Sequence, residues 1–207
     1  MKIAISQRVV DNNNYPERRD ALAQDWHLFC EKYLGRSILI PVPNATDSID
    51  RWFDIISPDA LILSGGNDLG EVEGRDSEEK SLLHRAILGG IPILGVCRGM
   101  HLINWFLGGG VPIKLGAGDV IKHAGSTHRI KILESHDQMF NGCEEVNSYH
   151  NMAIAPDKVA AAVQIAATSE EGFIEALTAK DKRIIAVQWH PERDLDVPDY
   201  SRDICAA

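Results

Sequence analysis

The chain of 207 residues has few cysteines, a shortage of basic residues and no long apolar run. Its cysteines, at positions 30, 97, 143 and 205, show neither close pairing nor zinc-type spacing, which argues against disulfides and a structural metal. Lysine and arginine total 21 against 30 acidic residues, and the net charge of -9 argues against a nucleic-acid or anionic-membrane binder. To bind an anionic small molecule, the protein would need arginines gathered at the binding site.

The absence of long apolar runs also bears on where the protein is located and how many domains it has. No stretch is long enough to span a bilayer, and residues 1–5 run directly into a strand pattern rather than a signal peptide, so we expect a cytoplasmic protein. With 44% hydrophobic residues, a chain of this length can bury one sizeable core. We expect a single domain over residues 1–207.

The most informative stretch is an apolar strand pattern that ends at residues 95–99, Gly-Val-Cys-Arg-Gly, and continues as a helical pattern. Glycines on both sides of Cys97 are typical of a sharp strand-to-helix turn, where side chains would clash. Such a turn lifts a nucleophile clear of the sheet, and the start of the helix favours a thiolate. By itself, the pattern is equally compatible with a buried cysteine that has only a structural role.

A second motif follows the apolar residues 184–187, near the end of the chain. Residues two apart on an extended segment point the same way, so His190 can face Cys97 as a general base while Glu192 orients the imidazole. Nucleophile, base and orienting carboxylate form the general logic of a catalytic triad. We therefore predict that Cys97, His190 and Glu192 are catalytic.

A third motif is the loop at residues 64–68, Ser-Gly-Gly-Asn-Asp, after a predicted strand. Its two glycines let backbone N–H groups turn toward a ligand, and acyl transfer through cysteine generates an oxyanion that such donors stabilise. We predict the amides of Gly66 and Arg98 as these donors. An ordinary strand-ending turn is the alternative for the glycines alone.

These motifs carry a family resemblance. The chain resembles a class I glutamine amidotransferase domain in the loop at 64–68, the turn at 95–99, residues 147–150 (Asn-Ser-Tyr-His) and residues 189–192 (Trp-His-Pro-Glu). Cys-Arg-Gly and Val-Asn-Ser-x-His are most similar to its γ-glutamyl hydrolase-like, peptidase C26-type branch. The resemblance implies cleavage of γ-glutamyl amides without a synthase partner.

The resemblance also implies substrate contacts. It places Ser148, Tyr149 and His150 near the amino-acid end of the substrate, beside Gly65 and Asn67 of the glycine loop. Within the branch, residues 5–8, 15–26 and 64–68 are similar to an enzyme that hydrolyses γ-glutamyl-CDP-amidate during assembly of a capsule phosphoramidate.

One position departs from the family pattern. Glutamine-using members usually carry Gln where this chain has His101. A neutral imidazole offers one donor and one acceptor, so His101 changes how the γ-glutamyl group can be held and argues against strict use of free glutamine.

Strand and helix patterns alternate in the first half of the chain. The predicted strands are 2–6, 37–42, 59–63 and 91–96, and the predicted helices are 16–33, 47–56, 77–88 and 98–107. The alternation predicts an α/β fold of the flavodoxin-like type, with an open, mostly parallel sheet, helices on both faces and functional groups beyond the carboxyl ends of the strands. Short strands at 129–133, 146–148 and 163–167, and hairpin arms at 173–178 and 184–188, predict a mixed, β-rich second half.

Polar residues after the first strand pattern could select the substrate. Gln7, Arg8 and Arg19 would lie near the cleft if that strand is central, and arginine pairs with phosphate through two parallel hydrogen bonds. A phosphate-bearing leaving group is one interpretation. The favoured alternative places Arg18 and Arg19 on a solvated helix face.

Two further histidines are candidate metal ligands. His123 and His128 could form a pair, but no third ligand of matching spacing accompanies them. A surface hairpin is the favoured interpretation, and we expect neither a metal nor an organic cofactor.

The sequence therefore predicts a standalone cysteine hydrolase that cleaves a γ-glutamyl C–N or P–N amide through a thioester and releases glutamate. Its substrate would be a small molecule, with a nucleotide-linked amidate as one version. Two alternatives stay open: a glutaminase subunit that passes ammonia to a synthase partner, and a non-catalytic ligand-binding domain of the same fold.

Overall fold

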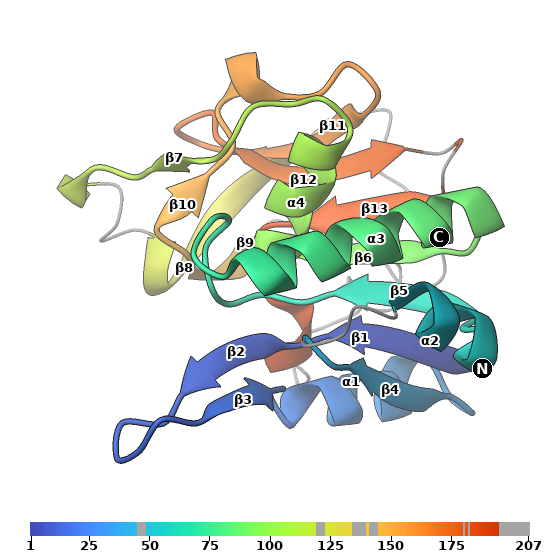
Figure 1. The fold of residues 1–207 in the computed structure, drawn as a ribbon. Coiled ribbons are helices and arrows are strands. Elements are labelled where there is room, and N and C mark those ends of the chain that lie inside the picture. Colours follow the sequence, from blue (N-terminus) through green and yellow to red (C-terminus); the bar gives the residue numbers. More distant parts are fainter. Residues whose placement is uncertain are drawn as a thin grey trace.

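One nine-stranded sheet organises the chain (Figure 1). The computed structural model describes residues 1–44, 49–118, 123–133, 140, 145–179, 181 and 183–194. In sheet order the strands are β4 (Ile38–Val42), β1 (Lys2–Ser6), β5 (Ala60–Leu63), β6 (Ile93–Val96), β13 (Ile184–Val187), β12 (Ile174–Ala179), β11 (Gln164–Ser169), β8 (Ala124–Ile132) and β9 (Glu145–Tyr149). The first five pair in parallel, and the pairs from β13 to β9 are antiparallel.

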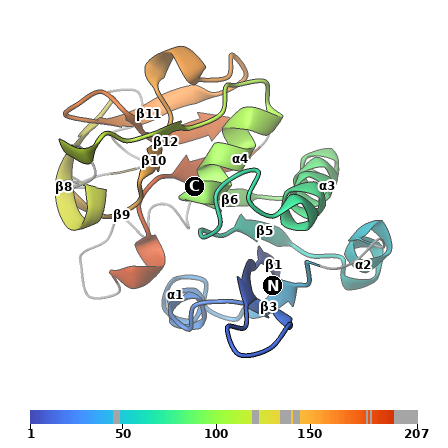
Figure 2. The same cartoon turned by 60° about the vertical axis from the view of Figure 1, so that its left-hand side comes forward.

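Four helices pack on the parallel half of the sheet. They are α1 (Asp25–Tyr33), α2 (Ile49–Ile56), α3 (Glu73–Gly89) and α4 (Arg98–Phe106). Neighbouring strand residues point to opposite faces, so Ala4 packs in one buried cluster with α2, α3 and α4, while Ile3 and Ile5 pack in another with α1. The turned view shows α1 on one side of β1 and β5, and α2 and α3 on the other (Figure 2). The predicted α/β class, with helices on both faces and a mixed second half, is confirmed.

The predicted helix over residues 16–33 is wrong in its first half. Residues 8–21 instead form a two-stranded sheet of β2 (Arg8–Asp11) and β3 (Arg18–Ala21), and α1 begins only at Asp25. Two contacts explain the difference: Arg18 pairs with Asp11 at 3.1 Å, and the Asn67 side-chain amide bonds both backbone groups of Val9. Arg18 and Arg19 therefore lie on a strand, so the predicted helix is wrong here, while the predicted solvent exposure of both side chains is confirmed.

Smaller differences concern element ends and short strands. Helix α3 begins four residues before the predicted start, and β7 (Ile113–Lys114) and β10 (Met152–Ala153) were not predicted. Two short 3-10 turns, η2 (Pro156–Lys158) and η4 (Pro191–Arg193), complete the elements. Residues 47 and 48 of the predicted helix, and the cysteines at 143 and 205, lie outside the described residues.

The surface-hairpin interpretation of His123 and His128 is also wrong. His123, directly before β8, is fully buried, and the His128 side chain is 11% exposed. Strand β8 pairs with β9 on one side and β11 on the other, so it lies inside the sheet rather than on a free hairpin.

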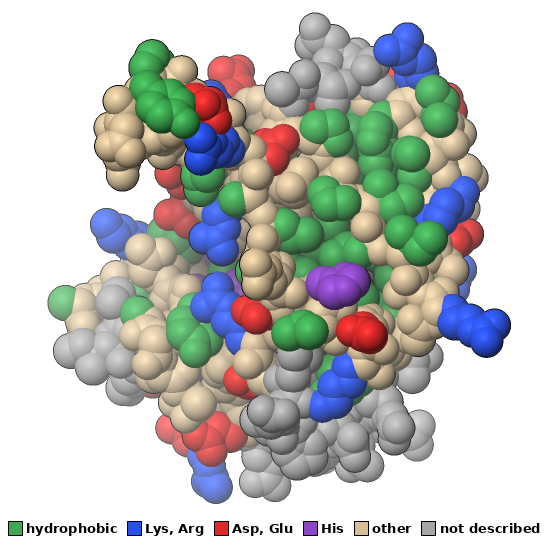
Figure 3. Space-filling model, turned by 90° about the horizontal axis from the view of Figure 1, so that it is seen from below, with side chains coloured by type: hydrophobic (Ala, Val, Ile, Leu, Met, Phe, Trp, Pro, Cys, Tyr) green, Lys and Arg blue, Asp and Glu red, His purple; other side chains and the backbone are tan. Residues whose placement is uncertain are grey.

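The outer strand β4 and helix α1 carry exposed apolar side chains. Ile38 is 67% exposed and Leu28 is 47% exposed, and from below, hydrophobic side chains gather on this face with charged ones toward its edges (Figure 3). Within the described part of the chain, no helix combines the length and apolar character needed to cross a bilayer.

Candidate active site

The candidate site lies where the parallel strands end. Strands β1, β5, β6 and β13 run in the same direction, so the residues that follow them meet at one edge of the sheet. Cys97 follows β6 directly, the glycine loop follows β5, and Gln188 begins the segment after β13. The fold thus brings the three sequence motifs together.

Cys97 occupies a strained turn between β6 and α4. Its φ of 54° and ψ of -107° lie in a region that non-glycine residues rarely adopt, and its N–H donates to the Val187 carbonyl at 2.8 Å. The turn needs small neighbours, because a Cβ on Gly99 would lie 2.1 Å from the Leu63 carbonyl oxygen. The close packing of α4 against β5 holds the partly exposed sulfur at the start of the helix.

His190 lies next to Cys97 and is held from behind by Glu192. The His190 Nδ1 atom is 2.7 Å from Glu192 Oε1, and both side chains are buried. Burial by itself lowers the pKa of His190, but the charge of Cys97 and hydrogen bonds to Cys97 and Glu192 raise that pKa to about 9. The His190 imidazole is therefore held in its protonated form at neutral pH.

Asn147 fixes the backbone that carries His190. Its side-chain amide donates to the His190 carbonyl at 2.7 Å, and its Oδ1 accepts from the His190 N–H at 2.9 Å. Asn147 belongs to β9, so the antiparallel half of the sheet sets the position of the histidine.

The amides of Gly66 and Arg98 face no acceptor among the described residues. Arg98 is the first residue of α4, where backbone N–H groups have no partner within the helix, and Gly66 has a φ of 82° that turns the loop. Both residues line a cavity of about 170 Å³ together with Cys97 and His190.

A buried charge network supports the glycine loop. The Arg75 guanidinium, fully buried on α3, donates to the carbonyls of Ser64 and Gly65 at 3.1 Å each and also to that of Gly66. Turning the Gly66 carbonyl toward α3 leaves the loop amides available on the other side. Arg75 therefore supports the geometry expected of an oxyanion site.

Two carboxylates complete the network. Glu79 pairs with Arg75 at 3.0 Å and also with the Arg98 side chain, which contacts Asp76 as well. Burial lowers the pKa of Arg98 to about 9, and the charge of Arg75 acts in the same direction while Asp76 opposes it. The two arginines and two carboxylates thus balance one another inside the protein.

The cavity includes several predicted substrate residues and not others. Besides the four named above, its lining includes Arg8, Asp68, His101, Tyr149, His150, Asn151, Met152 and Arg193. Gly65 lies between the catalytic candidates, since a Cβ there would be 2.8 Å from His190 Cε1 and 3.5 Å from Cys97 Cβ.

Four other predicted residues point elsewhere. The Gln7 amide donates to the Val42 carbonyl, Arg19 contacts Glu17 and the Tyr15 hydroxyl, and the buried Ser148 hydroxyl donates to the His123 carbonyl. Asn67 holds β2, as described above. These four stabilise the surroundings of the cavity rather than line it.

Gln188 makes a second contact with the Cys97 sulfur, and His101 in turn contacts Gln188. His101 Nε2 is 2.8 Å from Gln188 Oε1, and the Gln188 amide lies 3.7 Å from Cys97 Sγ. Burial lowers the pKa of His101 to about 4, with the Gln188 hydrogen bond opposing. His101 is therefore a neutral donor within the protein wall.

The sequence did not predict three residues of this site, which are Arg75, Gln188 and Arg193. Gln188 precedes His190 by two residues on an extended segment, so the argument that joined His190 to Glu192 could have found it. Arg75 and Glu79 have the i, i+4 spacing of a helical ion pair, but the predicted helix began after Arg75. The sequence around Arg193 carries no comparable signal.

Comparison with known proteins identifies the family. The model of the peptidase C26 family matches residues 3–192, which include the glycine loop, Cys97 and His190. The chain belongs to the peptidase C26 family.

Curated relatives agree with this C26 assignment. The γ-glutamyl-CDP-amidate hydrolase of Campylobacter jejuni subsp. jejuni serotype O:2 is 30% identical over 94% of this chain and 91% of its own length. A Mycobacterium tuberculosis relative whose name places it among the glutamine amidotransferases is 32% identical over 78% of this chain, but the match spans only 59% of that longer protein.

Solved structures support the C26 fold. The glutaminase domain of Trypanosoma brucei CTPS, with bound acivicin, superposes with a TM-score of 0.69 over 99% of this chain and 89% of its own, at 16% identity. The resemblance to class I glutamine amidotransferases, found first in the motifs, is thereby confirmed for family and fold.

Proposed function

We propose that this C26 protein is a cysteine-dependent hydrolase that cleaves γ-glutamyl amides and releases glutamate. The observation that carries the proposal is the contact series at the strand ends, in which Cys97 is hydrogen-bonded to His190 and His190 lies 2.7 Å from Glu192. A nucleophile, a base and a group that orients the base are what acyl transfer through cysteine requires. Membership in a family of amide hydrolases supports the same substrate class.

The proposed reaction has two steps. The Cys97 thiolate attacks the γ-carbonyl carbon, and the oxyanion accepts hydrogen bonds from the Gly66 and Arg98 amides. The His190 imidazolium donates its proton to the leaving nitrogen as the C–N bond breaks, which leaves a thioester and a neutral imidazole. That imidazole then takes a proton from water, whose oxygen attacks the thioester, and glutamate leaves as the thiolate re-forms.

We further propose that the leaving group carries phosphate, as in γ-glutamyl-CDP-amidate. Arg8 and Arg193 both line the cavity that contains Cys97, and guanidinium groups suit phosphate oxygens. The extensive match to the Campylobacter hydrolase supports this narrower substrate. Arg19, by contrast, pairs with Glu17 outside the cavity, so Arg8 replaces it as the candidate for phosphate binding.

The test is glutamate release by the isolated chain from four substrates: glutamine, a γ-glutamyl amine, a γ-glutamyl polyglutamate and a γ-glutamyl nucleotide amidate. We expect the nucleotide amidate to give the highest kcat/KM. Rapid turnover of glutamine alone would contradict the specialised hydrolase, and weak activity that a synthase partner strongly stimulates would favour a glutaminase subunit.

Two cysteine variants separate catalysis from folding. Cys97→Ala should remove activity on every substrate, because no other group takes the place of the nucleophile. Cys30→Ala is the matched control: Cys30 is buried in α1, and burial raises the pKa of its thiol to about 11. Unchanged activity in Cys97→Ala would exclude the proposed mechanism, and equal losses in both variants would indicate a folding defect.

A further inference from the structure

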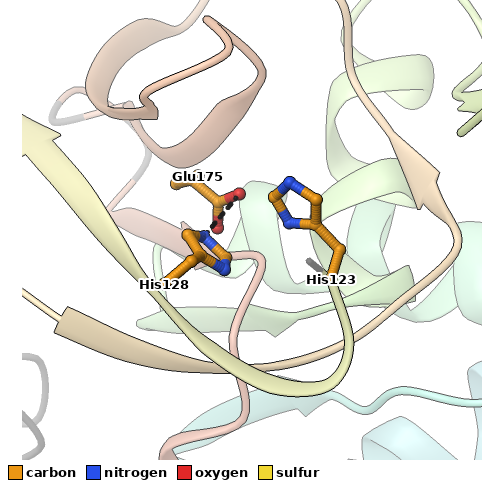
Figure 4. A group of neighbouring side chains, drawn as sticks. All are labelled: His123, His128 and Glu175. Carbon is orange, nitrogen blue, oxygen red and sulfur yellow. Dashed lines mark ion pairs between the residues drawn. The ribbon is translucent and has the colours of Figure 1, made fainter. Parts of the chain in front are cut away.

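A second cluster of chemically active side chains lies in the antiparallel half of the sheet. His123 directly before β8, His128 within β8 and Glu175 on β12 turn toward one another (Figure 4). One ligand atom from each residue lies within 4.8 Å of the others. His150, which follows β9, adds a fourth donor, with Nε2 3.9 Å from Glu175 Oε1.

The cluster is enclosed. Glu175 and His123 are fully buried, His150 is 5% exposed and the His128 side chain is 11% exposed. Neither carboxylate oxygen of Glu175 has a hydrogen-bond partner among the described residues, although His128 Nε2 is 3.2 Å away. A buried carboxylate without donors is costly, and a cation bound directly to its oxygens would offset that cost.

The tautomer of one histidine is already set for coordination. His150 Nδ1 lies 2.9 Å from the Met152 carbonyl oxygen and must donate to it, which leaves the Nε2 lone pair directed into the cluster. Histidine ligands of metals commonly donate their other ring N–H to a backbone carbonyl in this way. Nε2 of His150 has no hydrogen-bond partner among the described residues.

The spacing fits a small cation. Tetrahedral bonds of about 2.1 Å separate neighbouring ligand atoms by about 3.4 Å. The contact of 3.2 Å between His128 and Glu175 is already close to this spacing, and because the three atoms all lie within 4.8 Å of one another, no pair needs to close by more than about 1.4 Å. Rotations of side chains at one end of the sheet can supply such a movement.

We propose that His123, His128, His150 and Glu175 bind one first-row divalent transition metal ion of the zinc type. Three imidazoles and a carboxylate form a ligand set suited to such ions rather than to Ca²⁺ or Mg²⁺, which prefer oxygen ligands. The ion would join β8 to β12, which are separated by β11 in the sheet. Because His150 also lines the catalytic cavity, it would fix one residue of that wall.

The test measures metal content and geometry in the tag-free, full-length chain. After removal of metals with a chelator and titration with zinc, we expect one zinc ion per chain by mass spectrometry and a higher melting temperature. Cobalt in place of zinc should give the strong visible absorption of a tetrahedral site. Less than a tenth of an ion per chain at saturating zinc would overturn the proposal.

Variants assign the ion to this cluster. Glu175→Gln and His128→Ala should each weaken zinc binding by about 100-fold or more, and His128→Ala at the more exposed edge keeps the test informative if the buried change impairs folding. His27→Ala, on the exposed side of α1, is the matched control and should bind like the wild type. Unchanged affinity in both cluster variants would refute the assignment.

One outcome separates this proposal from the catalytic one. Cys97→Ala should keep full zinc content, since Cys97 is not among the four ligands. Loss of zinc in that variant would place the ion at the catalytic cysteine and overturn the site, whatever the activity assays show.

Discussion

Two clusters of buried titratable side chains lie in the two halves of the same sheet, and they are balanced differently. At the ends of the parallel strands, His190 faces Cys97 on one side and Glu192 on the other, which raises its pKa to about 9 against the effect of burial. In the antiparallel half, burial lowers the pKa of His150 to about 3, and the charge of His123 adds to the effect. The first cluster favours a charged His190, and the second favours a neutral His150.

The difference follows from what surrounds each cluster. Helix α3 supplies Arg75, Asp76 and Glu79 to the parallel half, so each arginine there meets a carboxylate. No helix supplies a lysine or arginine to Glu175, whose oxygens face only histidines among the described residues. A buried charge is retained when it is paired. The first cluster is complete with its own side chains, and the second is completed by a cation in our proposal.

The largest expected effect comes from removing the carboxylate that completes the first cluster. Glu192→Gln should lower kcat/KM by about 10³-fold to 10⁴-fold, because an amide neither stabilises the imidazolium nor fixes its tautomer. It should also lower the pKa of His190, so the alkaline limit of the pH–rate profile should move to lower pH. Kinetics from pH 5 to 10 measure both effects. Glu170→Gln, on the surface, is the control, and equal rates for the two variants would contradict the role of Glu192.

The second change unbalances the arginine network instead. Arg98→Met leaves Glu79 and Asp76 with Arg75 alone, and breaking a buried pair costs about 3–5 kcal/mol of unfolding free energy. Arg85→Met is the matched control, because Arg85 pairs with exposed Asp54 and such surface pairs contribute about 0.2–1 kcal/mol. Urea unfolding measures both values. A similar, small loss in the two variants would show that the buried network is not essential for stability.

The buried networks also mark the limit of what the sequence could predict. The parallel strands and the β12–β13 hairpin were predicted closely, because apolar runs between turn residues depend on local pattern. The start of α3 was missed because its first turns carry charged residues, and their burial depends on partners such as Arg98 and the glycine loop that lie in other segments. Strand β3 was predicted as part of a helix because its strand form depends on pairing with β2, and β2 is in turn held by Asn67 in another loop.

The candidate site divides in the same way. Cys97, His190 and Glu192 stand in motifs and could be proposed from sequence, and their catalytic roles stay predictions. Glu175 could not be proposed, because it acquires its histidine partners only when distant strands meet. Arg75 was missed for a local reason, since the predicted helix began after it. His123 and His128 looked like a pair without a third ligand since the carboxylate comes from β12, across the sheet.

The third prediction concerns the pH dependence of stability and rests on His101, a buried histidine beside Gln188. Its pKa in the folded protein is about 4, against an ordinary 6.5, so the unfolded chain binds the extra proton between these values. Stability should therefore be complete above pH 6.5, fall as the pH drops toward 4 and level off below. The shift of about 2.5 pH units corresponds to about 3 kcal/mol.

Thermal unfolding across this range checks the sign and size of the effect. His101→Asn keeps a polar group near Gln188 but cannot titrate, so its stability should depend less on pH between 6.5 and 4 than that of the wild type. His84→Asn, at an exposed position on α3, should retain the wild-type slope. The same slope in His101→Asn and wild type would show that His101 is not the group responsible.

The smallest expected effect concerns the position of the His190 imidazole. It tests whether the turnover rate depends on the distance between His190 and Cys97 as well as on the charges around them. Gly65→Ala places a methyl group 2.8 Å from His190 Cε1, closer than such contacts allow, so the imidazole must shift relative to Cys97. Such a misplacement should lower kcat about 10-fold to 100-fold while leaving the ion pairs of α3 intact. Gly118→Ala is the control, since its new Cβ meets nothing within 4 Å. Wild-type kcat in Gly65→Ala would show that the imidazole tolerates the displacement. The balance of charges would then be the difference that separates the cluster of Cys97, His190 and Glu192 from the histidine cluster.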